Sequence, residues 1–258
     1  MKDLQTYREL LDKYRKLYES AHRHVSEHAS RPKKELSDHR HEQKKVFADG
    51  CGFYKLFWVF LLGSFYGDIV ETLFVRITAG EWMSRSSLVF GQFSLVWGIG
   101  CFLLTLFLHR MIGWEDRYIL IAGTVLGGAF EYFCSVFTEK AFGVVFWDYS
   151  HMRFNLNGRI NLLYCFFWGI MAVVWLKMIY PWMSKCIERI PVLWGKILTW
   201  VLLVFMVANI FISAAALYRM NVRDTDPVPK NWAERYVDTH FTDEWIENRY
   251  RNLEHVRE

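Results

Sequence analysis

The 258-residue sequence has little of what a soluble enzyme or a disulfide-stabilised domain would need. Its five cysteines form no CxxC pair, and four of them lie within or beside apolar segments. They are therefore expected to be small buried residues, not a zinc site or a disulfide framework. No P-loop, HExxH, GxSxG or DFG-type set is present. ATP hydrolysis by this chain is not expected, enzymatic activity is not favoured, and no metal or other cofactor is predicted.

The sequence also lacks a strong charge of one sign. A formal net charge of +4 is too small to indicate nucleic-acid binding, and no basic, aromatic-interleaved motif accompanies it. The first residues, MKDLQTYRELLDKYRK, are charged and contain no apolar core. They predict that no cleavable signal peptide is present.

Apolar residues, in contrast, are abundant: 53% of the chain is hydrophobic and 18% aromatic. They are concentrated between a basic extension at 1–50 and a polar tail at 219–258, which predicts a transmembrane domain at 51–218. A membrane-spanning helix needs about 20 mostly apolar residues. Five segments meet this requirement and predict an all-α, polytopic helical membrane protein with spans at about 52–75, 87–109, 118–138, 160–180 and 194–218.

Basic residues predict how these spans are oriented. Residues 1–55 carry thirteen Lys and Arg, more than any loop between the spans. The positive-inside rule then places the N-terminus and the 177–196 loop in the cytoplasm. The protein is thus expected in a cell membrane, in contact with lipids. Five crossings would place the C-terminal tail outside, whereas its seven Lys and Arg leave open a missed or re-entrant segment and thus the side of the tail.

Both ends of the chain predict helices. A heptad-like seam precedes Arg31-Pro32, and it favours either a weak coiled coil that would form a homo-oligomer or packing on the membrane surface. In the tail, DPVPKNW predicts a helix start at Asn231, and TDEWIENRYRNLEHV predicts a short amphipathic helix that docks on the membrane domain. The seam consists of Leu4, Tyr7, Leu11, Tyr14, Tyr18, Ala21 and Val25.

The stretch GSFYGDIVE, residues 63–71, places Asp68 and Glu71 where hydrocarbon is expected. Gly63, Gly67 and Glu71 are four residues apart and form one stripe on a helix. Small residues at this spacing let a second helix backbone approach closely. Glu71 is therefore predicted to face protein and not lipid.

The same pattern recurs in the third span. Gly123, Gly127 and Glu131 repeat the stripe, an arginine follows each glutamate (Arg85 and Arg159), and each of the next apolar segments contains Trp-Gly-Ile, in VWGIG and FWGIM. The order of these features predicts a parallel duplication of a two-helix hairpin.

The buried charges need an explanation because a charge near mid-bilayer costs at least about 2.5 kcal/mol. The economical pairs are Glu71 with Arg85 and Glu131 with Arg159. Two interpretations stay open. The pairs fix helix register, or they line a polar pocket between the repeats that binds a cation or headgroup or relays protons. Glu139 and Asp148 add more charge than locking two hairpins requires.

The third loop, FGVVFWDYSHMRFNLNGRI, is the most distinctive stretch. Trp147 and Tyr149 are typical of a membrane interface. Asp148 and Asn155 are short acceptors suited to turns, and Gly158 permits a tight backbone. Together these side chains are expected at one mouth of the predicted pocket.

Several of these segments resemble the ABC-transporter type IV (CmpB-like) family of bacterial multi-span membrane proteins. The resemblance covers most of residues 52–252, and its most specific element is the WDYS…N…GRI stretch. Where family members read N-R-G-x-L-x-G-P…PIYG, this chain has SRSSLVFGQ…LVWG, so Arg85, Gly91 and Gly98 match and the prolines do not. The segments that carry the resemblance are GSFYGDIVE, FEYFCSVFTEKAFGVVFWDYS, FNLNGRINL, FWGI and THFTDEWIENRYRN.

The resemblance implies a permease that works with a separate ATPase subunit, and residues 181–196 are the expected cytoplasmic coupling helix. Two other functions remain open from the residues themselves. One is a membrane enzyme or binding protein that handles lipid headgroups through Asp148 and Arg159. The other is a non-catalytic scaffold whose N-terminal helix recruits partners.

Overall fold

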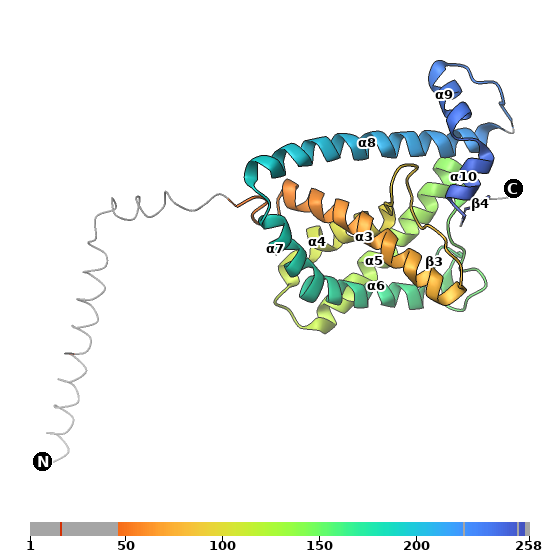
Figure 1. Ribbon diagram of the computed structural model, residues 1–258. Helices are drawn as coiled ribbons and strands as arrows, with labels where there is room; N and C mark the ends of the chain where they lie inside the picture. The colour runs from red at the N-terminus through yellow and green to blue at the C-terminus, as the bar shows by residue number, and fades with distance from the viewer. Residues whose placement is uncertain (1–15, 17–45, 224, 252, 256–258) are drawn as a thin grey trace, which may run out of the picture. The chain divides into compact units, whose positions relative to one another are not determined.

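The computed structural model describes residues 46–223, 225–251 and 253–255, with Lys16 alone before them. The predicted coiled-coil seam and most of the basic extension lie outside the described residues. The described part from residue 46 onwards is a helical bundle with a small helical tail (Figure 1). The predicted all-α membrane fold is confirmed.

Four described helices are long and apolar enough to cross a membrane. They are α3 (Phe53–Ala79), α5 (Asp116–Phe142), the continuous helix Leu162–Glu188 and α8 (Val192–Arg223). At 1.5 Å per residue, the 32 residues of α8 span about 48 Å, which exceeds the ~30 Å of bilayer hydrocarbon.

The second predicted span differs from the expectation. Residues 81–94 are not helical, and α4 covers only Leu95–Leu108 before a 3₁₀ turn at His109–Met111. Together α4 and this turn are about 26 Å long, less than the ~30 Å needed to cross a membrane. Five full-length spanning helices are thus not confirmed, because the second apolar segment is half loop and half helix.

The fourth predicted span is longer than expected. It begins as α6 (Leu162–Val174), passes through a π-helical turn (Trp175–Ile179) and continues as α7 (Tyr180–Glu188). The predicted span stops at residue 180, directly before Pro181, since proline lacks the N–H that a helix interior requires. Proline is tolerated at the start of a helical segment, and here it stands in the first turn of α7. Residues 181–196 therefore hold the end of this helix and the start of α8, so the expected separate coupling helix is wrong.

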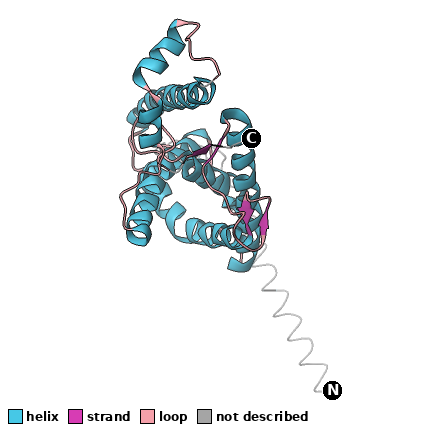
Figure 2. Ribbon diagram, turned by 90° about the vertical axis from the view of Figure 1, so that its right-hand side faces the viewer, coloured by secondary structure: helices cyan, strands magenta, loops and turns pink. Residues whose placement is uncertain are grey.

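The short strands of the described chain lie in the connection between α5 and α6 and at the end of the tail (Figure 2). β1 (Val144–Val145) pairs antiparallel with β4 (Glu254–His255), and β2 (Asn155–Leu156) pairs antiparallel with β3 (Ile160–Asn161). Both α3 and α5 end at a left-handed glycine, Gly80 and Gly143, a conformation that glycine adopts without steric cost.

The tail forms two helices, as predicted. Asn231 caps α9 (Trp232–His240) by accepting a hydrogen bond from the Glu234 N–H, and Thr242 caps α10 (Asp243–Arg249). Ile246 and Tyr250 are fully buried in a cluster with Val89, Val144 and Leu217. The tail thus docks on the ends of α8 and the two connecting loops.

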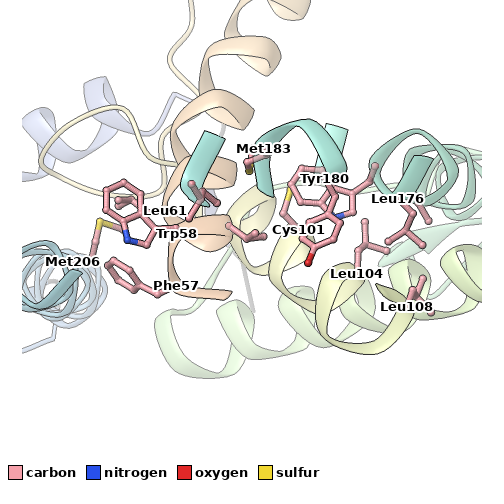
Figure 3. Packing of buried hydrophobic residues seen from close by; sticks show 14 of the residues in the cluster. Phe57, Trp58, Leu61, Cys101, Leu104, Leu108, Leu176, Tyr180, Met183 and Met206 are labelled. Atoms are coloured by element: carbon pink, nitrogen blue, oxygen red, sulfur yellow. The ribbon is translucent and has the colours of Figure 1, made fainter. Parts of the chain in front are cut away.

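The larger core lies between α3, α4, α7 and α8 (Figure 3). Two hydrogen bonds between side chains lie inside it: the Trp58 indole N–H donates to Thr199, and the Trp175 indole N–H donates to Thr105. Such buried groups are costly unless they are hydrogen-bonded. The residues of this core that Figure 3 labels are Phe57, Trp58, Leu61, Cys101, Leu104, Leu108, Leu176, Tyr180, Met183 and Met206.

The two ends of the bundle carry different contacts. At one end, Lys55 at the start of α3 pairs with Glu188 at the end of α7, and Phe47 packs against Gly195. At the other end, β4 joins β1 and α10 lies beside the α3–α4 loop (Figure 1). Residues 46–55 and the tail therefore occupy opposite ends of the described bundle.

Candidate functional site

The α3–α4 hairpin is packed through its glycines. A Cβ on Gly67 would overlap the side chain of Trp97, and a Cβ on Gly63 would come within 2.9 Å of Cys101 Cβ. Across the interface, a Cβ on Gly98 would overlap Ser64. The helix backbones thus approach as closely as the glycine stripe predicted.

The α5–α6 hairpin repeats these contacts position by position. A Cβ on Gly127 would overlap Trp168, one on Gly123 would overlap Ala172, and one on Gly169 would overlap Thr124. The two Trp-Gly-Ile tryptophans also meet each other, with ring centroids 6.0 Å apart. The repeat found in the sequence is therefore a repeat of helix packing, and its two copies touch at Trp97 and Trp168.

Glu71 is fully partnered in the first hairpin. Its Oε1 accepts from Arg85 Nε at 2.8 Å, and its Oε2 accepts from Trp97 Nε1 at 2.7 Å. The carboxylate faces protein, and Arg85 is the partner that the sequence predicted. The motif Trp-Gly-Ile thus supplies two things: a glycine for close packing and an indole donor for the acid.

Glu131 is only half partnered in the second hairpin. Its Oε1 accepts from the Tyr149 hydroxyl at 2.8 Å, and its Oε2 is buried without a hydrogen bond to the described residues. Trp168, the counterpart of Trp97, also approaches this carboxylate. Burial, followed by the neighbouring Glu131 carboxylate, raises the pKa of Tyr149, so this hydroxyl stays a donor.

Arg159 does not pair with Glu131, contrary to the expected pairing. Its guanidinium forms an ion pair with Glu139 and donates from Nη1 to Ser135 Oγ at 3.2 Å. Glu139 lies two helical turns beyond Glu131 on α5, nearer the loop that carries Arg159. The predicted Glu131–Arg159 pair is therefore wrong, because the fold of the 143–161 loop places the Arg159 guanidinium beside Glu139.

The remaining candidates in the 143–161 loop hold the loop itself. Asp148 accepts from the backbone and hydroxyl of Ser150, and Asn155 accepts from the Gly158 N–H. Trp147 donates to the Arg159 carbonyl at 3.0 Å. These side chains fold the loop so that Tyr149 reaches Glu131 and Arg159 reaches Glu139. Hydrogen bonds from Ser150 lower the pKa of Asp148.

Residues 84–94, named the inner loop here, enter the bundle beside α8 (Figure 1). Val89 N–H donates to Ser213 at 3.0 Å, and the Phe90 backbone exchanges hydrogen bonds with the Asn209 side chain at 3.2 and 2.8 Å. Ser94 N–H donates to the Ser64 carbonyl in the middle of α3. Non-helical backbone at membrane depth requires such partners.

The tail also holds the inner loop. Arg249 of α10 donates to the Leu88 carbonyl at 3.0 and 2.8 Å and to the Gly91 carbonyl. The Tyr250 hydroxyl donates to the Ser87 carbonyl at 3.3 Å, and burial raises the pKa of Tyr250 to about 12. The sequence analysis missed Asn209 and Ser213, although polar residues inside a predicted span are a signal for such contacts. It also missed Arg249, which lies in the tail, outside the predicted spans.

Asp68 is the most isolated polar group of this region. It is 1% exposed, and both carboxylate oxygens are buried without a hydrogen bond to the described residues. The charged groups that act on it are Arg249, Glu71 and Arg85. The sequence analysis singled out Asp68 because it lies in an apolar segment, but it predicted no partner for this residue.

The model of one protein family, described as "Putative ABC-transporter type IV", matches residues 58–214. This range contains both hairpins, the inner loop and most of α8, and it covers more than half of the chain. The chain belongs to this family. Among curated proteins and solved structures, no match was found.

Proposed function

We propose that this family member is a permease-like component of a transporter, in which the acids of the duplicated hairpins serve a substrate route between the two copies. The observation that supports this most is the position of Glu71 and Glu131. They occupy equivalent places on α3 and α5, and the tryptophans opposite them touch across the repeat boundary.

The inner loop adds a second argument. Transporters commonly place their binding sites beside interrupted helices, where irregular backbone meets a half-helix in the middle of the membrane. Here the α4 half-helix begins next to Ser64, in the middle of α3. Purely structural ion pairs would not require this interruption.

A separate ATPase subunit is the partner that we propose to energise the transport. The end of the bundle that carries Lys55, Glu188 and the α7–α8 turn would face the cytoplasm. The ATPase subunit would bind at this end. The basic residues before Lys55 support this orientation in a cell membrane. The tail would then lie outside.

The test uses membrane vesicles from cells of the native host in which the gene for this protein is deleted. The cells are complemented with the wild-type or the variant chain. The vesicles are supplied with ATP and a total small-molecule extract of the same cells, and accumulated solutes are identified by mass spectrometry. At least one solute should accumulate with wild type and not with Glu71→Gln/Glu131→Gln at equal membrane abundance.

Asp116→Asn is the matched control, because Asp116 is an exposed acid at the start of α5 that pairs with Lys177 at 3.4 Å. It should accumulate the same solute as wild type. If wild-type vesicles accumulate nothing beyond vesicles without the chain, the proposed transport is refuted.

A further inference from the structure

We infer that Asp68 binds an exchangeable proton, delivered through Glu71 from the end of the bundle where the tail lies. This inference rests on the proposed function, and it adds a proton-binding residue to the substrate route. The Asp68 side chain is 1% exposed, and neither carboxylate oxygen accepts a hydrogen bond from the described residues.

The isolation of Asp68 is costly only while the group is charged. An ionised carboxylate in an apolar setting loses its hydration, and a protonated one loses much less. The Arg85 backbone N–H also acts on Asp68, but its hydrogen bond goes to Thr72 Oγ1 at 3.4 Å. No hydrogen bond from the described residues therefore replaces the water that a charged Asp68 would need.

A proton suits this position better than a metal ion. Two guanidinium groups, Arg85 and Arg249, act on Asp68, and they would repel a bound cation. A metal ion also needs several oxygen ligands around it. A proton needs one oxygen, forms a covalent O–H bond and leaves the site neutral.

The same guanidinium groups make the proton exchangeable. Burial without a hydrogen-bond partner favours the neutral form of a carboxyl group, and positive charges nearby favour the ionised form. Arg249 has no carboxylate within ion-pair distance in the described chain and is held instead by the Leu88 and Gly91 carbonyls. Its positive charge is therefore not neutralised by another acid of the described chain.

Glu71 provides the path. It lies three residues after Asp68 on α3, so the two side chains leave neighbouring positions of the helix surface. The Glu71 side chain is 26% exposed, whereas Asp68 is closed off. A proton that enters at Glu71 needs one transfer along the helix to reach Asp68, and Glu71 is the other acidic group described as acting on Asp68.

The experiment records infrared difference spectra of the full chain in lipid nanodiscs between about pH 5 and about pH 9. Wild type should show the carbonyl band of a protonated carboxylic acid that titrates across this range. Asp68→Asn, which keeps the side-chain volume, should lose this band, and Asp116→Asn should keep it. A band that persists in Asp68→Asn, or its absence from wild type, overturns the inference.

Two further variants test the mechanism. In Arg249→Gln the midpoint of the band should move to higher pH, because a positive charge that favours the ionised form is gone. In Glu71→Gln the band should remain while its exchange in heavy water slows. Unchanged midpoint and exchange would also contradict the inference. These spectra need no transported solute, so transport can fail while the proton site stands, and the reverse.

Discussion

The two hairpins pack their helices in the same way but satisfy their acids differently. In α3–α4, Glu71 has two donors, Arg85 and Trp97. In α5–α6, Glu131 has one, Tyr149, and the arginine of that copy pairs with Glu139. The comparison teaches that glycine positions determine helix packing, whereas the loop after each helix determines the surroundings of the acid.

The two loops differ because the second helices begin at different heights. α4 begins two residues before Trp97, whereas α6 begins six residues before Trp168. The inner loop must therefore reach deeper into the bundle, and it depends on α8 and the tail for hydrogen bonds. The 143–161 loop is held largely by its own turns and β-hairpin.

The largest effect is expected where the hairpins are alike. Gly67→Ala and Gly127→Ala should each lower the free energy of unfolding by about 1–3 kcal/mol, because the added Cβ overlaps a tryptophan. The measurement is thermal unfolding in detergent. Gly113→Ala is the control, since a Cβ there meets nothing within 4 Å. If only one of the two variants is destabilised, the hairpins are not packed equivalently.

The next prediction tests where they differ. Double-mutant cycles with Gln replacements should give coupling energies of about 0.5–3 kcal/mol for Glu71 with Arg85 and for Glu139 with Arg159. The cycle for Glu131 with Arg159 should stay within about 0.5 kcal/mol. Stability of the purified chain in detergent supplies the energies. Strong coupling in this last cycle would show that the sequence-predicted pair forms after all.

A smaller effect is expected at the hydroxyl that serves Glu131. Tyr149→Phe removes the one hydrogen bond that Glu131 accepts in the described chain and should cost about 0.5–1.5 kcal/mol at neutral pH. The pKa of Tyr149 is raised in the folded protein, so its stabilisation is present below the unfolded value of about 10 and is lost as pH rises.

Unfolding temperatures of wild type and Tyr149→Phe, measured from neutral pH to above about pH 10, test this pH dependence. The two should converge above about pH 10, where the unfolded tyrosine ionises. A difference that is constant with pH would mean that the hydroxyl proton plays no part in the contact.

Much of this comparison was predictable from the sequence, because glycine spacing and Trp-Gly-Ile report directly on helix packing. The stripe Gly63, Gly67, Glu71 and its copy led to the correct hairpins, and the Glu71–Arg85 pair was predicted correctly. The turn chemistry of Asp148 and Asn155 was predictable too, since it is local.

What the sequence could not show depends on contacts between distant segments. The apolar run at 87–109 has the composition of a span, yet Asn209 and Ser213 of α8 offer its first half backbone hydrogen bonds that a helix would supply internally. The partner of Arg159 depends on how the 143–161 loop folds over α5. In both cases the deciding atoms are far apart in the chain.

The smallest effect belongs to the loop that holds itself. Asp148→Ala removes acceptors from Ser150, but the site is exposed, so the loss at neutral pH should stay below about 0.5 kcal/mol. Because the pKa of Asp148 is lowered in the folded protein, its contribution is present above the unfolded value of about 3.9 and disappears as pH falls below it. Unfolding temperatures near pH 7 and pH 3 measure this, and the variants should coincide at the lower pH. A loss as large as that of Tyr149→Phe would mean that this turn, and not the hydroxyl contact alone, determines the surroundings of Glu131. The 143–161 loop, held by its own turns, would then not differ from the inner loop in the way proposed above.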